Sequence, residues 1–324
     1  MNSCLIIGAG MTGLAAAREL TAQGWEVTTL DKGRGVGGRM ATRRIQDTRA
    51  DHGAQYFSVR TPEFRQLIDK LEAEGVAQAW DLEKAGIEHP RYFGANGMST
   101  IPKHLAEDLN IILKERATLI QSEGTGCRVT TEAGNSYTAD ALILTIPAPQ
   151  AATLLQDSKI PLNEAGEHAF AAIVYQPCLS LLVLLKAPSR IPEPGLVKFE
   201  EGDIATVTDN QQKGIAPEQP TVTIQASPAF SLANLEGDLQ EAGQKLLDHL
   251  TDWIPTESIV EYQVHRWRYS LADIRSPEPF AALNTPFPLL MGGDGFGMGN
   301  VEGAFQSGLQ MAKVLGEKRQ LELT

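Results

Sequence analysis

Two glycine-rich turns, one near each end of the 324-residue chain, are the residues whose types and spacing most clearly predict chemistry. The first turn is Gly8-Ala9-Gly10-Met11-Thr12-Gly13. In this spacing Gly8 makes a tight turn, Gly10 lets the main chain approach a pyrophosphate, and Gly13 lets a helix pack against a strand. Asp31 stands where a carboxylate accepts hydrogen bonds from a ribose diol, and its charge would repel a 2′-phosphate. The turn therefore predicts dinucleotide binding, with FAD or NAD favoured over NADP.

The elements that must position this turn are predicted on either side of it. Cys4–Ile7 is a short apolar run typical of a parallel strand buried on both faces. Residues 14–23 carry apolar side chains at helical spacing, and residues 26–30 form a second strand that ends before Asp31. The amino end of the helix would offer N–H groups and a partial positive charge to phosphates. Strand, turn, helix and acid thus occur in the order that dinucleotide binding requires.

The second turn, near the carboxyl end, repeats this arrangement. Residues 288–291 are predicted as a strand and residues 301–315 as a helix, and between them lies Gly292-Gly293-Asp294-Gly295-Phe296-Gly297-Met298-Gly299-Asn300. A strand, a glycine turn with one carboxylate and a helix again predict a site for phosphate and sugar. A cofactor domain is therefore expected to be assembled from both ends of the chain.

Three further segments resemble motifs of the flavoprotein superfamily that includes amine oxidases and glutathione-reductase-type enzymes. They are Arg34-Gly35-Val36-Gly37-Gly38-Arg39-Met40, Asp51-His52-Gly53-Ala54-Gln55-Tyr56-Phe57 and Gly94-Ala95-Asn96-Gly97-Met98-Ser99. The resemblance implies that the first segment lies beside the FAD pyrophosphate, where arginine forks can pair with it, and that the second lies beside the flavin. It also implies that Asp294 holds the ribityl chain and that the following helix faces the pyrimidine edge.

The resemblance identifies the cofactor as FAD, and its expected ligands come from all these segments. They are Gly8, Gly10, Met11, Thr12, Gly13, Asp31, Lys32, Arg34, Gly38, Arg39, Met40, His52, Gly53, Ala54, Gln55, Tyr56, Gly293, Asp294, Asn300 and Val301. We expect FAD to be bound non-covalently, because no cysteine stands in the sequence context of a covalent flavin attachment.

The predicted fold class is α/β, with a Rossmann-type FAD-binding domain of the glutathione-reductase and amine-oxidase kind and a second α+β domain built on an antiparallel sheet. The FAD-binding domain is predicted to comprise residues 1–54, 96–160 and 263–324, and the substrate domain residues 55–95 and 161–262. Within the second domain, residues 177–186 and 259–267 are predicted strands and residues 238–253 an amphipathic helix. Residues 211–220 are predicted to form a mobile loop.

An aromatic face is the candidate for substrate binding. If the strand at residues 259–267 continues, His265, Trp267 and Tyr269 lie on one of its faces, because strand side chains alternate. Together with Phe296 they are the candidate catalytic residues, as the wall against which a planar substrate rests. For His265, a place in an interdomain core remains an open alternative.

The chain as a whole resembles the renalase branch of the amine-oxidase-like flavoproteins, through the motifs above and the segment His265–Ser270. The resemblance implies oxidation of the 2- and 6-dihydro isomers of NAD(P)H to NAD(P)⁺, with oxygen reduced to hydrogen peroxide. Such a dihydropyridine gives up one hydride and needs no general base beyond correct placement. Two alternatives stay open: a flavin-containing amine oxidase, and an FAD-binding sensor without turnover.

Charge and composition exclude other classes of function. The chain has 28 Lys and Arg against 40 Asp and Glu, a formal charge of −12, so it lacks the basic footprint of a nucleic-acid-binding protein. Its three cysteines and six histidines show no ligand spacing, so no metal is expected. The amino-terminal apolar run is too short for a signal peptide or membrane span, which predicts a cytoplasmic protein without a membrane partner. The sequence does not specify an oligomeric state.

Overall fold

A computed structural model describes residues 2–322, and the chain divides into two compact units. Unit 1 comprises Met1–Gly38, Pro102–Val174 and Ala272–Thr324. Unit 2 comprises Arg39–Ile101 and Tyr175–Leu271. Each unit is therefore built from stretches that are separated in the sequence.

Unit 1 is organised around a six-stranded sheet with the strand order β17-β18-β11-β1-β2-β7. Its strands are β1 (Ser3–Ile7), β2 (Glu26–Asp31), β7 (Asn110–Leu113), β11 (Ala141–Leu144), β17 (Phe280–Leu283) and β18 (Leu289–Gly292). All neighbouring pairs are parallel except β17 and β18. The parallel β1–β2 pair with α1 (Met11–Ala22) between them is the predicted strand–turn–helix–strand unit.

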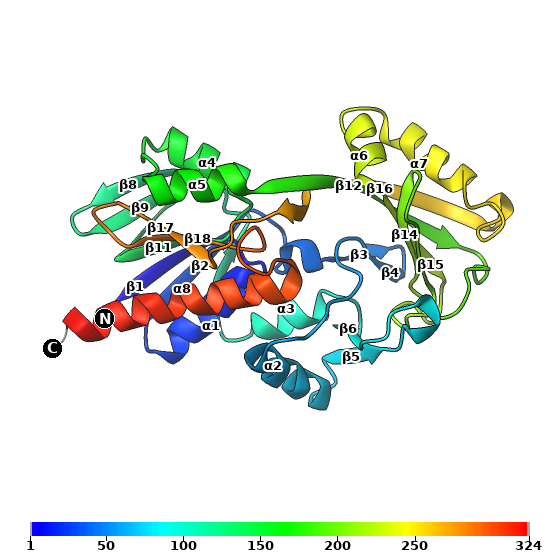
Figure 1. Ribbon diagram of the computed structural model, residues 1–324, viewed down its shortest axis with the longest axis horizontal. Coiled ribbons are helices and arrows are strands. Elements are labelled where there is room, and N and C mark those ends of the chain that lie inside the picture. The colour runs from blue at the N-terminus through cyan, green and yellow to red at the C-terminus, as the bar shows by residue number, and fades with distance from the viewer. Residues whose placement is uncertain (1, 323–324) are drawn as a thin grey trace. The chain divides into compact units, whose positions relative to one another are not determined.

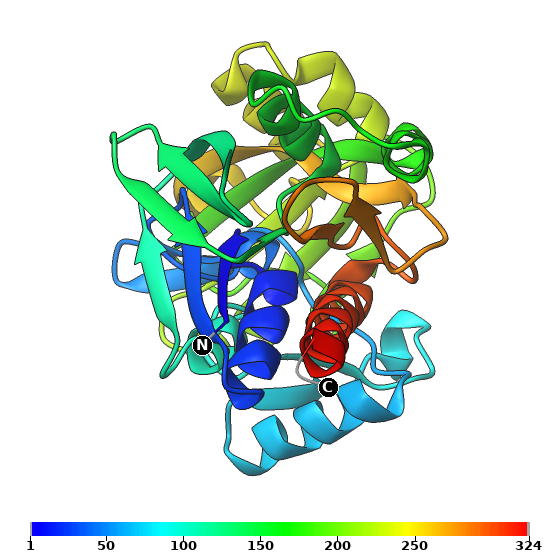
Figure 2. The same ribbon diagram turned by 90° about the vertical axis from the view of Figure 1, so that its left-hand side faces the viewer.

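Two helices cover one face of this sheet. Figure 2 shows α1 and the carboxyl-terminal α8 (Asn300–Glu322) side by side. The two backbones come this close because of Gly308, at which a Cβ atom would lie 2.2 Å from the carbonyl oxygen of Thr12. Apolar side chains of both helices and of the sheet form one core, with Leu20, Ile143 and Met311 among its members. The amino ends of α1 and α8 thus belong to one rigid packing arrangement.

A smaller antiparallel sheet and further helices lie on the other face, as Figure 1 shows. The sheet has the order β10-β9-β8, and the elements of this layer are β8 (Ala117–Glu123), β9 (Gly126–Thr131), β10 (Ser136–Ala139), α4 (Ala148–Asp157) and α5 (Glu164–Ala172). The hairpin predicted at residues 132–135 is confirmed by the pairing of Thr130 with Ser136. The short helix α3 (Thr100–Leu105) leads into this unit.

Unit 2 is organised around a five-stranded sheet with the order β13-β14-β15-β12-β16. Its strands are β12 (Val174–Leu185), β13 (Leu196–Lys198), β14 (Ile204–Asp209), β15 (Thr221–Ala226) and β16 (Ile259–Ile274). Leu181 and Val183 of β12 pack into the core formed with α7 (Leu239–Asp248). Leu182 and Leu184 point to the other face, where they pack against a β-hairpin. Because both faces are covered, β12 is apolar at successive positions.

Two hairpins and several helices complete unit 2. They are the hairpin of β3 (Thr42–Ile45) with β4 (Thr48–Asp51), the hairpin of β5 (Ala77–Trp80) with β6 (Arg91–Gly94), the helices α2 (Pro62–Ala73) and α6 (Pro228–Asn234), and the short 3₁₀ helices η1 (Gly38–Met40), η2 (Glu83–Ala85) and η3 (Thr256–Ser258). The β3–β4 hairpin is the one that packs on β12, through Ile45 and Ala50.

The predicted fold class is confirmed, and three local predictions need correction. The helix expected at residues 238–253 ends earlier, at Asp248. Its amino end is where the sequence predicts it, and Asp238 caps it by accepting hydrogen bonds from the N–H groups of Gln240 and Glu241. The strand expected at residues 259–267 continues to Ile274. The loop at residues 211–220 was expected to be mobile, but it is packed into unit 2, and Lys213 is buried within it.

The predicted domain bounds divide the chain into segments that bind the cofactor and segments that bind the substrate. This division stays a prediction. The compact units differ from it at residues 39–54, 96–101 and 263–271, which belong to unit 2, and at residues 161–174, which belong to unit 1.

Candidate functional site

The first glycine turn, in unit 1, has the geometry that a phosphate-binding turn requires. Gly8 adopts a φ of +112°, which favours glycine, and a Cβ atom at Gly13 would lie 1.9 Å from the carbonyl oxygen of Gly8. A Cβ atom at Gly10, in contrast, would meet nothing within 4 Å. Gly10 also caps α1 without a side-chain hydrogen bond, so no capping side chain binds the first N–H groups of the helix, at Met11 and Thr12. An anion fits here.

Asp31, at the end of β2, binds main-chain N–H groups of the glycine turn and of the loop after β2. The carboxylate of Asp31 accepts hydrogen bonds from the N–H groups of Ala9, at 2.7 Å, and of Gly33, at 2.6 Å. A carboxylate has about four lone-pair sites, so these two bonds fix its orientation and leave capacity for a ribose diol. Lys32 and Arg34 are exposed, and Lys32 donates to the side chain of Gln150.

The second glycine turn, also in unit 1, is closed by its own helix. The N–H group of Gly293, at a φ of +149°, donates to the hydroxyl of Ser307 on α8. Asp294 is buried in this turn, and Asn300 begins α8 with a φ of +56°, followed by the half-buried Val301. Phe296 is 2% exposed. The role of Phe296 in the wall for the substrate stays a prediction.

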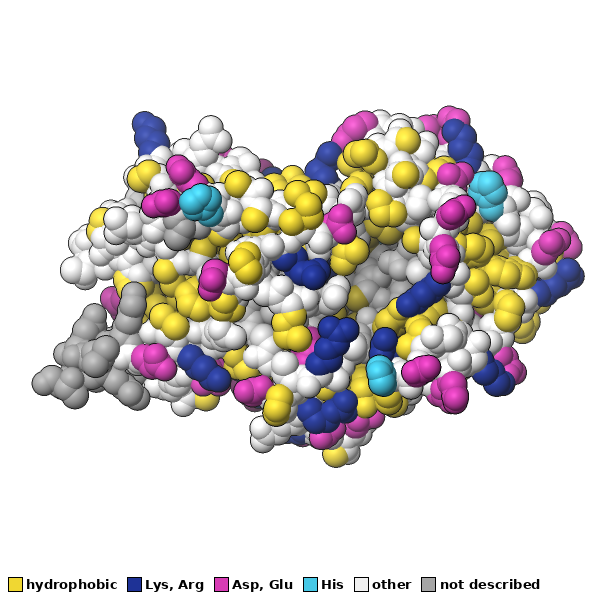
Figure 3. Space-filling view, in the orientation of Figure 1, with side chains coloured by type: hydrophobic (Ala, Val, Ile, Leu, Met, Phe, Trp, Pro, Cys, Tyr) yellow, Lys and Arg dark blue, Asp and Glu magenta, His cyan; other side chains and the backbone are white. Residues whose placement is uncertain are grey.

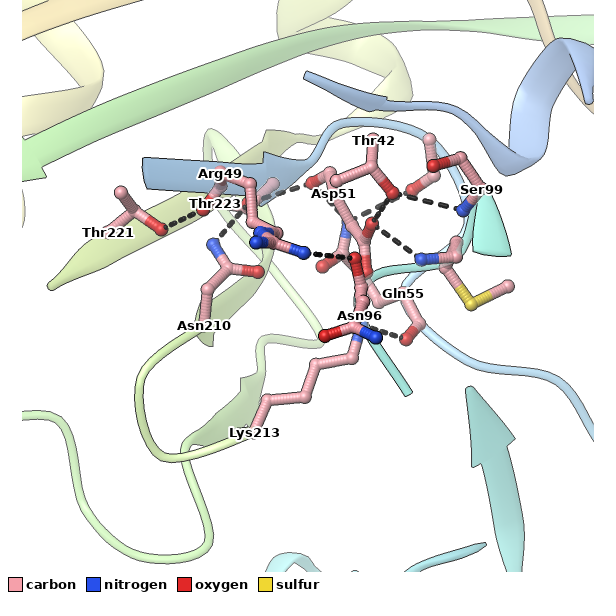
Figure 4. A network of polar contacts seen from close by, with 12 residues as sticks. Thr42, Arg49, Asp51, Gln55, Asn96, Ser99, Asn210, Lys213, Thr221 and Thr223 are labelled. Atoms are coloured by element: carbon pink, nitrogen blue, oxygen red, sulfur yellow. Dashed lines mark hydrogen bonds and ion pairs between the residues drawn. The ribbon is translucent and has the colours of Figure 1, made fainter. Parts of the chain in front are cut away.

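In unit 2, the end of β4 and the residues after it are held through their backbone carbonyls by side chains of β15. Thr221 donates to the carbonyl of Arg49, Thr223 to that of Asp51, and Gln225 to that of Gly53. Because alternate residues of a strand lie on one face, these three donors form a row that matches alternate carbonyls of the docked segment. We call residues 49–55 the held segment. Figure 4 shows the two threonines at its start.

A buried lysine fixes the other end of the held segment. Lys213, whose side chain has no exposed surface, lies 2.7 Å from the Asp51 carboxylate and donates to the carbonyl of Gln55 (Figure 4). Burial lowers the pKa of Lys213, whereas the charge of Asp51 raises it. The second carboxylate oxygen accepts from Thr42 and from the N–H of Met98. The ion pair is therefore enclosed and hydrogen-bonded, as a buried pair must be.

Three rings meet on one side of the held segment. The rings of His52 and Trp267 stack with centroids 4.9 Å apart, and His265 lies 5.2 Å from His52. The indole N–H of Trp267 donates to the carbonyl of His52 at 2.7 Å, which fixes the indole against the segment. Tyr269 instead packs edge-on against Tyr175. The predicted face on β16 therefore forms in part, and His52 joins it.

Both imidazoles of this ring cluster are uncharged at neutral pH. Burial, with the neighbouring His265 and Arg43 as smaller causes, lowers the pKa of His52 to about 3. Burial also lowers the pKa of His265, with Arg43 as the second cause. Nδ1 of His52 and Nε2 of His265 are buried without a hydrogen-bond partner in the described part of the chain, so a proton added there would be poorly satisfied. We refer to His52, His265 and Trp267 as the ring cluster.

The remaining predicted ligands in unit 2 are arranged around the same segment. The carbonyl of Arg39 accepts from the N–H of Ala54, and a Cβ atom at Gly53 would lie 2.0 Å from that carbonyl oxygen. The guanidinium of Arg39 donates to the carbonyl of Tyr269. Met40 is buried, and the ring of Tyr56 lies beneath the cations of Arg91 and Lys198.

The predicted site residues thus fall into two sets, one in each unit. Unit 1 contains both glycine turns with Asp31 and Asp294, and unit 2 contains Arg39, the held segment and the ring cluster. Sequence reasoning missed Lys213 and the donors of β15. The polar residues at alternate positions of Thr221-Val222-Thr223-Ile224-Gln225 were the available signal, since they mark a second, polar face on a buried strand.

Comparison with known families decides which class of protein has this architecture. The model of an NAD(P)-binding Rossmann-like domain matches residues 6–71, and the model of the flavin containing amine oxidoreductase family matches residues 74–315. The chain belongs to the flavin-containing amine oxidoreductase family. The predicted cofactor, FAD, is thereby confirmed, and the protein is an FAD-dependent oxidoreductase.

Individual relatives refine this assignment. Renalase of Mus musculus is 27% identical over 340 aligned residues, which cover 97% of this chain and 99% of the mouse protein. This match confirms the predicted resemblance to renalases. A 4,4′-diapophytoene desaturase of Staphylococcus aureus is 32% identical over 102 residues, or 32% of this chain and 20% of the desaturase. The solved structure of putrescine oxidase bound to putrescine shares the fold, with a TM-score of 0.72, 16% identity and coverage of 97% and 98% of the two chains.

The residues present fit the flavin dinucleotide of this family. The space beside Gly10 and the uncapped start of α1 suit a pyrophosphate, and Asp31 suits the adenosine ribose. All three cysteines are free and buried, and burial raises the pKa of the Cys127 thiol to about 11 and of the Cys178 thiol to about 12. Among the described helices, none is long and apolar enough to cross a membrane.

Proposed function

We propose that this FAD-dependent oxidoreductase oxidises the 2- and 6-dihydro isomers of NAD(P)H to NAD(P)⁺, and that oxygen is reduced to hydrogen peroxide. The observation that carries the proposal is the ring cluster, which is aromatic and uncharged. A dihydronicotinamide ring is itself flat and uncharged, and stacking on an indole would orient it at little cost in conformational entropy. The near full-length match to mouse renalase supports the resemblance from which this substrate class was expected.

The residues of the ring cluster suit a reaction without proton removal. A dihydronicotinamide loses one hydride and becomes an aromatic cation, so no proton leaves the reacting carbon. Two imidazoles held neutral by burial do not repel the developing cation. Bound FAD supplies the hydride acceptor. The role left to this chain is to place the substrate ring, through the Trp267 indole that His52 anchors.

A second candidate, oxidation of amines, is favoured by the description of the matched family. Amine oxidation would also use an aromatic wall, so the two candidates differ in the substrate rather than in the fold. Non-covalent attachment of FAD, oxygen as electron acceptor and a cytoplasmic location belong to the same proposal. The three buried cysteines support the non-covalent attachment.

The experiment that tests the proposal is anaerobic rapid mixing of the FAD-loaded enzyme with a panel of reductants. We expect 6-dihydro-NAD and 2-dihydro-NAD to bleach the flavin absorbance, and amines such as putrescine to leave it unchanged. Trp267→Ala should slow the reduction about 10-fold or more, and by more than it lowers FAD content, if stacking supplies ~1.5 kcal/mol. His265→Ala should have a smaller effect. Reduction by amines alone would assign the enzyme to the second candidate, and no reduction by any member would indicate a sensor.

A further inference from the structure

An arginine-lined hollow in unit 2 is not used by the reaction proposed above. It measures about 280 Å³ and is lined by Ser58, Val59, Arg60, Arg65, His89, Pro90 and Arg91. Three of the seven lining residues are arginines, and none is acidic. In a chain of net charge −12, such a local excess of positive charge needs an explanation. Figure 3 shows Lys or Arg side chains and a histidine over the region where Figure 1 draws α2, β5 and β6, with Asp and Glu side chains around them.

Two of these arginines, Arg65 and Arg91, are fixed by contacts that use only part of their hydrogen-bonding capacity. Nη1 of Arg65 donates to the Tyr92 hydroxyl at 2.8 Å, and the guanidinium lies 5.1 Å from the centre of the Tyr92 ring. Nη1 of Arg91 donates to the carbonyl oxygens of His89 and Pro90. A guanidinium carries five N–H donors, so Arg65 and Arg91 can each keep their position and still bind an anion through the remaining donors. The carboxylate of Asp69, at 3.5 Å from Arg65, lies outside the lining.

We propose that this hollow binds a phosphate-bearing anion. Convergent guanidinium groups bind phosphate oxygens through paired, charge-assisted hydrogen bonds, which makes phosphate a better match than a neutral ligand. The volume is at the small end of ligand pockets, which begin at about 300 Å³, so it suits a phosphate or pyrophosphate group rather than a whole dinucleotide. Tyr56 connects the hollow to the held segment, since Arg91 lies 6.0 Å from the centre of its ring.

The phosphate group has two possible sources. The pyrophosphate of a dihydronicotinamide dinucleotide is one, and this assignment rests on the proposed function. A free phosphorylated anion is the other, and it requires no particular substrate. In both cases the hollow recognises the same chemistry.

The site itself is tested by calorimetric titration of inorganic pyrophosphate into the FAD-loaded protein at low ionic strength. We expect saturable binding to the wild type, and a loss of affinity of about 10-fold or more for Arg60→Gln/Arg91→Gln, because each lost charge-assisted hydrogen bond costs about that factor. Arg44→Gln removes one positive charge from an exposed position on β3, as each substitution of the double variant does in the hollow, and should bind as the wild type does. Absence of saturable binding, or equal affinity in the double variant, would overturn the proposal. If the double variant does not fold, the exposed Arg60→Gln alone provides the comparison.

The source of the phosphate is tested by kinetics with two reductants, 6-dihydro-NAD and the phosphate-free N-methyl-1,6-dihydronicotinamide. If the hollow binds the substrate, the double variant raises KM for the dinucleotide about 10-fold, leaves kcat unchanged, and does not alter KM for the small compound. An unchanged KM for the dinucleotide, with weakened pyrophosphate binding, would assign the hollow to a free anion. If neither compound reduces the flavin, the proposed function fails while the pyrophosphate titration still decides the site.

Discussion

The glycine turn at residues 8–13 depends on the close approach of main chain to main chain, to which Asp31 and Thr145 add side-chain hydrogen bonds, whereas the held segment is fixed chiefly by side chains that come from distant strands. At Gly13 the approach of the Gly8 carbonyl excludes any side chain. In the held segment, donors from β15, β16 and the loop at Lys213 bind the carbonyls one by one. A site built from backbone is encoded by glycine spacing within a few residues. A site built from side chains is encoded by residues far away in the chain, such as Lys213 and Thr223, which lie 162 and 172 positions from Asp51.

The largest effect is expected where the held segment depends on a buried charge. Lys213→Met leaves the carboxylate of Asp51 buried without its cation, and breaking such a pair costs about 3–5 kcal/mol. Chemical denaturation of the FAD-loaded protein measures this loss. The matched control is Lys84→Met, which removes the cation of an exposed ion pair with Glu193 and should unfold as the wild type does. Equal stability of the two variants would show that the ion pair does not hold the segment.

The next effect separates the two roles of glycine in the first turn. Gly13→Ala places a methyl group against the Gly8 carbonyl and should destabilise the protein by about 3 kcal/mol, the upper range for overpacking. Gly10→Ala meets no protein atom, and the φ of −80° at Gly10 suits any residue. We therefore expect Gly10→Ala to unfold normally without FAD and to bind FAD at least about 10-fold more weakly. Wild-type FAD affinity in Gly10→Ala would place the pyrophosphate elsewhere.

The ring cluster predicts a pH dependence of stability. Because burial holds the pKa of His52 at about 3, below its ordinary value near 6.5, the folded state binds a proton less readily than the unfolded chain. The contribution of His52 to the free energy of unfolding is therefore fully present above pH 6.5. It is lost as the pH decreases toward 3, and the loss is about 2 kcal/mol at pH 5. His265 and Arg43, the groups that face His52, act in the same direction. His52→Phe should show a weaker decrease between about pH 7 and pH 5, whereas His168→Phe, at an exposed position, should follow the wild type.

The smallest effect concerns one donor of β15. Thr223→Val keeps the shape of the side chain and removes two hydrogen bonds: the one donated to the Asp51 carbonyl, which still accepts from Gln55, and the one accepted from the Asn210 amide. The expected loss of unfolding free energy is about 1–2 kcal/mol. Thr118→Val, which removes a hydrogen bond on the exposed surface of β8, should cost less. A loss as large as that of Lys213→Met would mean that the threonine row, and not the ion pair, determines the position of the segment.

The same comparison explains how much of the molecule could be predicted from the sequence. Strands β1 and β2, helix α1 and the carboxyl-terminal turn were predictable because periodicity and glycine spacing are local signals. The β3–β4 hairpin was not, since its strands have four residues each and contain exposed arginines. Lys213 was missed because the residues around it in the sequence are polar and rich in glycine and proline, which is typical of an exposed loop. Its burial depends on Asp51, which is far away in the chain.

The central claim, that the enzyme oxidises dihydronicotinamide isomers, is tested most directly by the stoichiometry of its products. Wild-type enzyme is incubated with 6-dihydro-NAD in air-saturated buffer, and NAD⁺, hydrogen peroxide and consumed oxygen are measured together. The account predicts equal amounts of all three, because one hydride leaves each substrate and two electrons reduce each oxygen. Failure to form NAD⁺, with aldehyde and hydrogen peroxide formed instead from an amine, would contradict it.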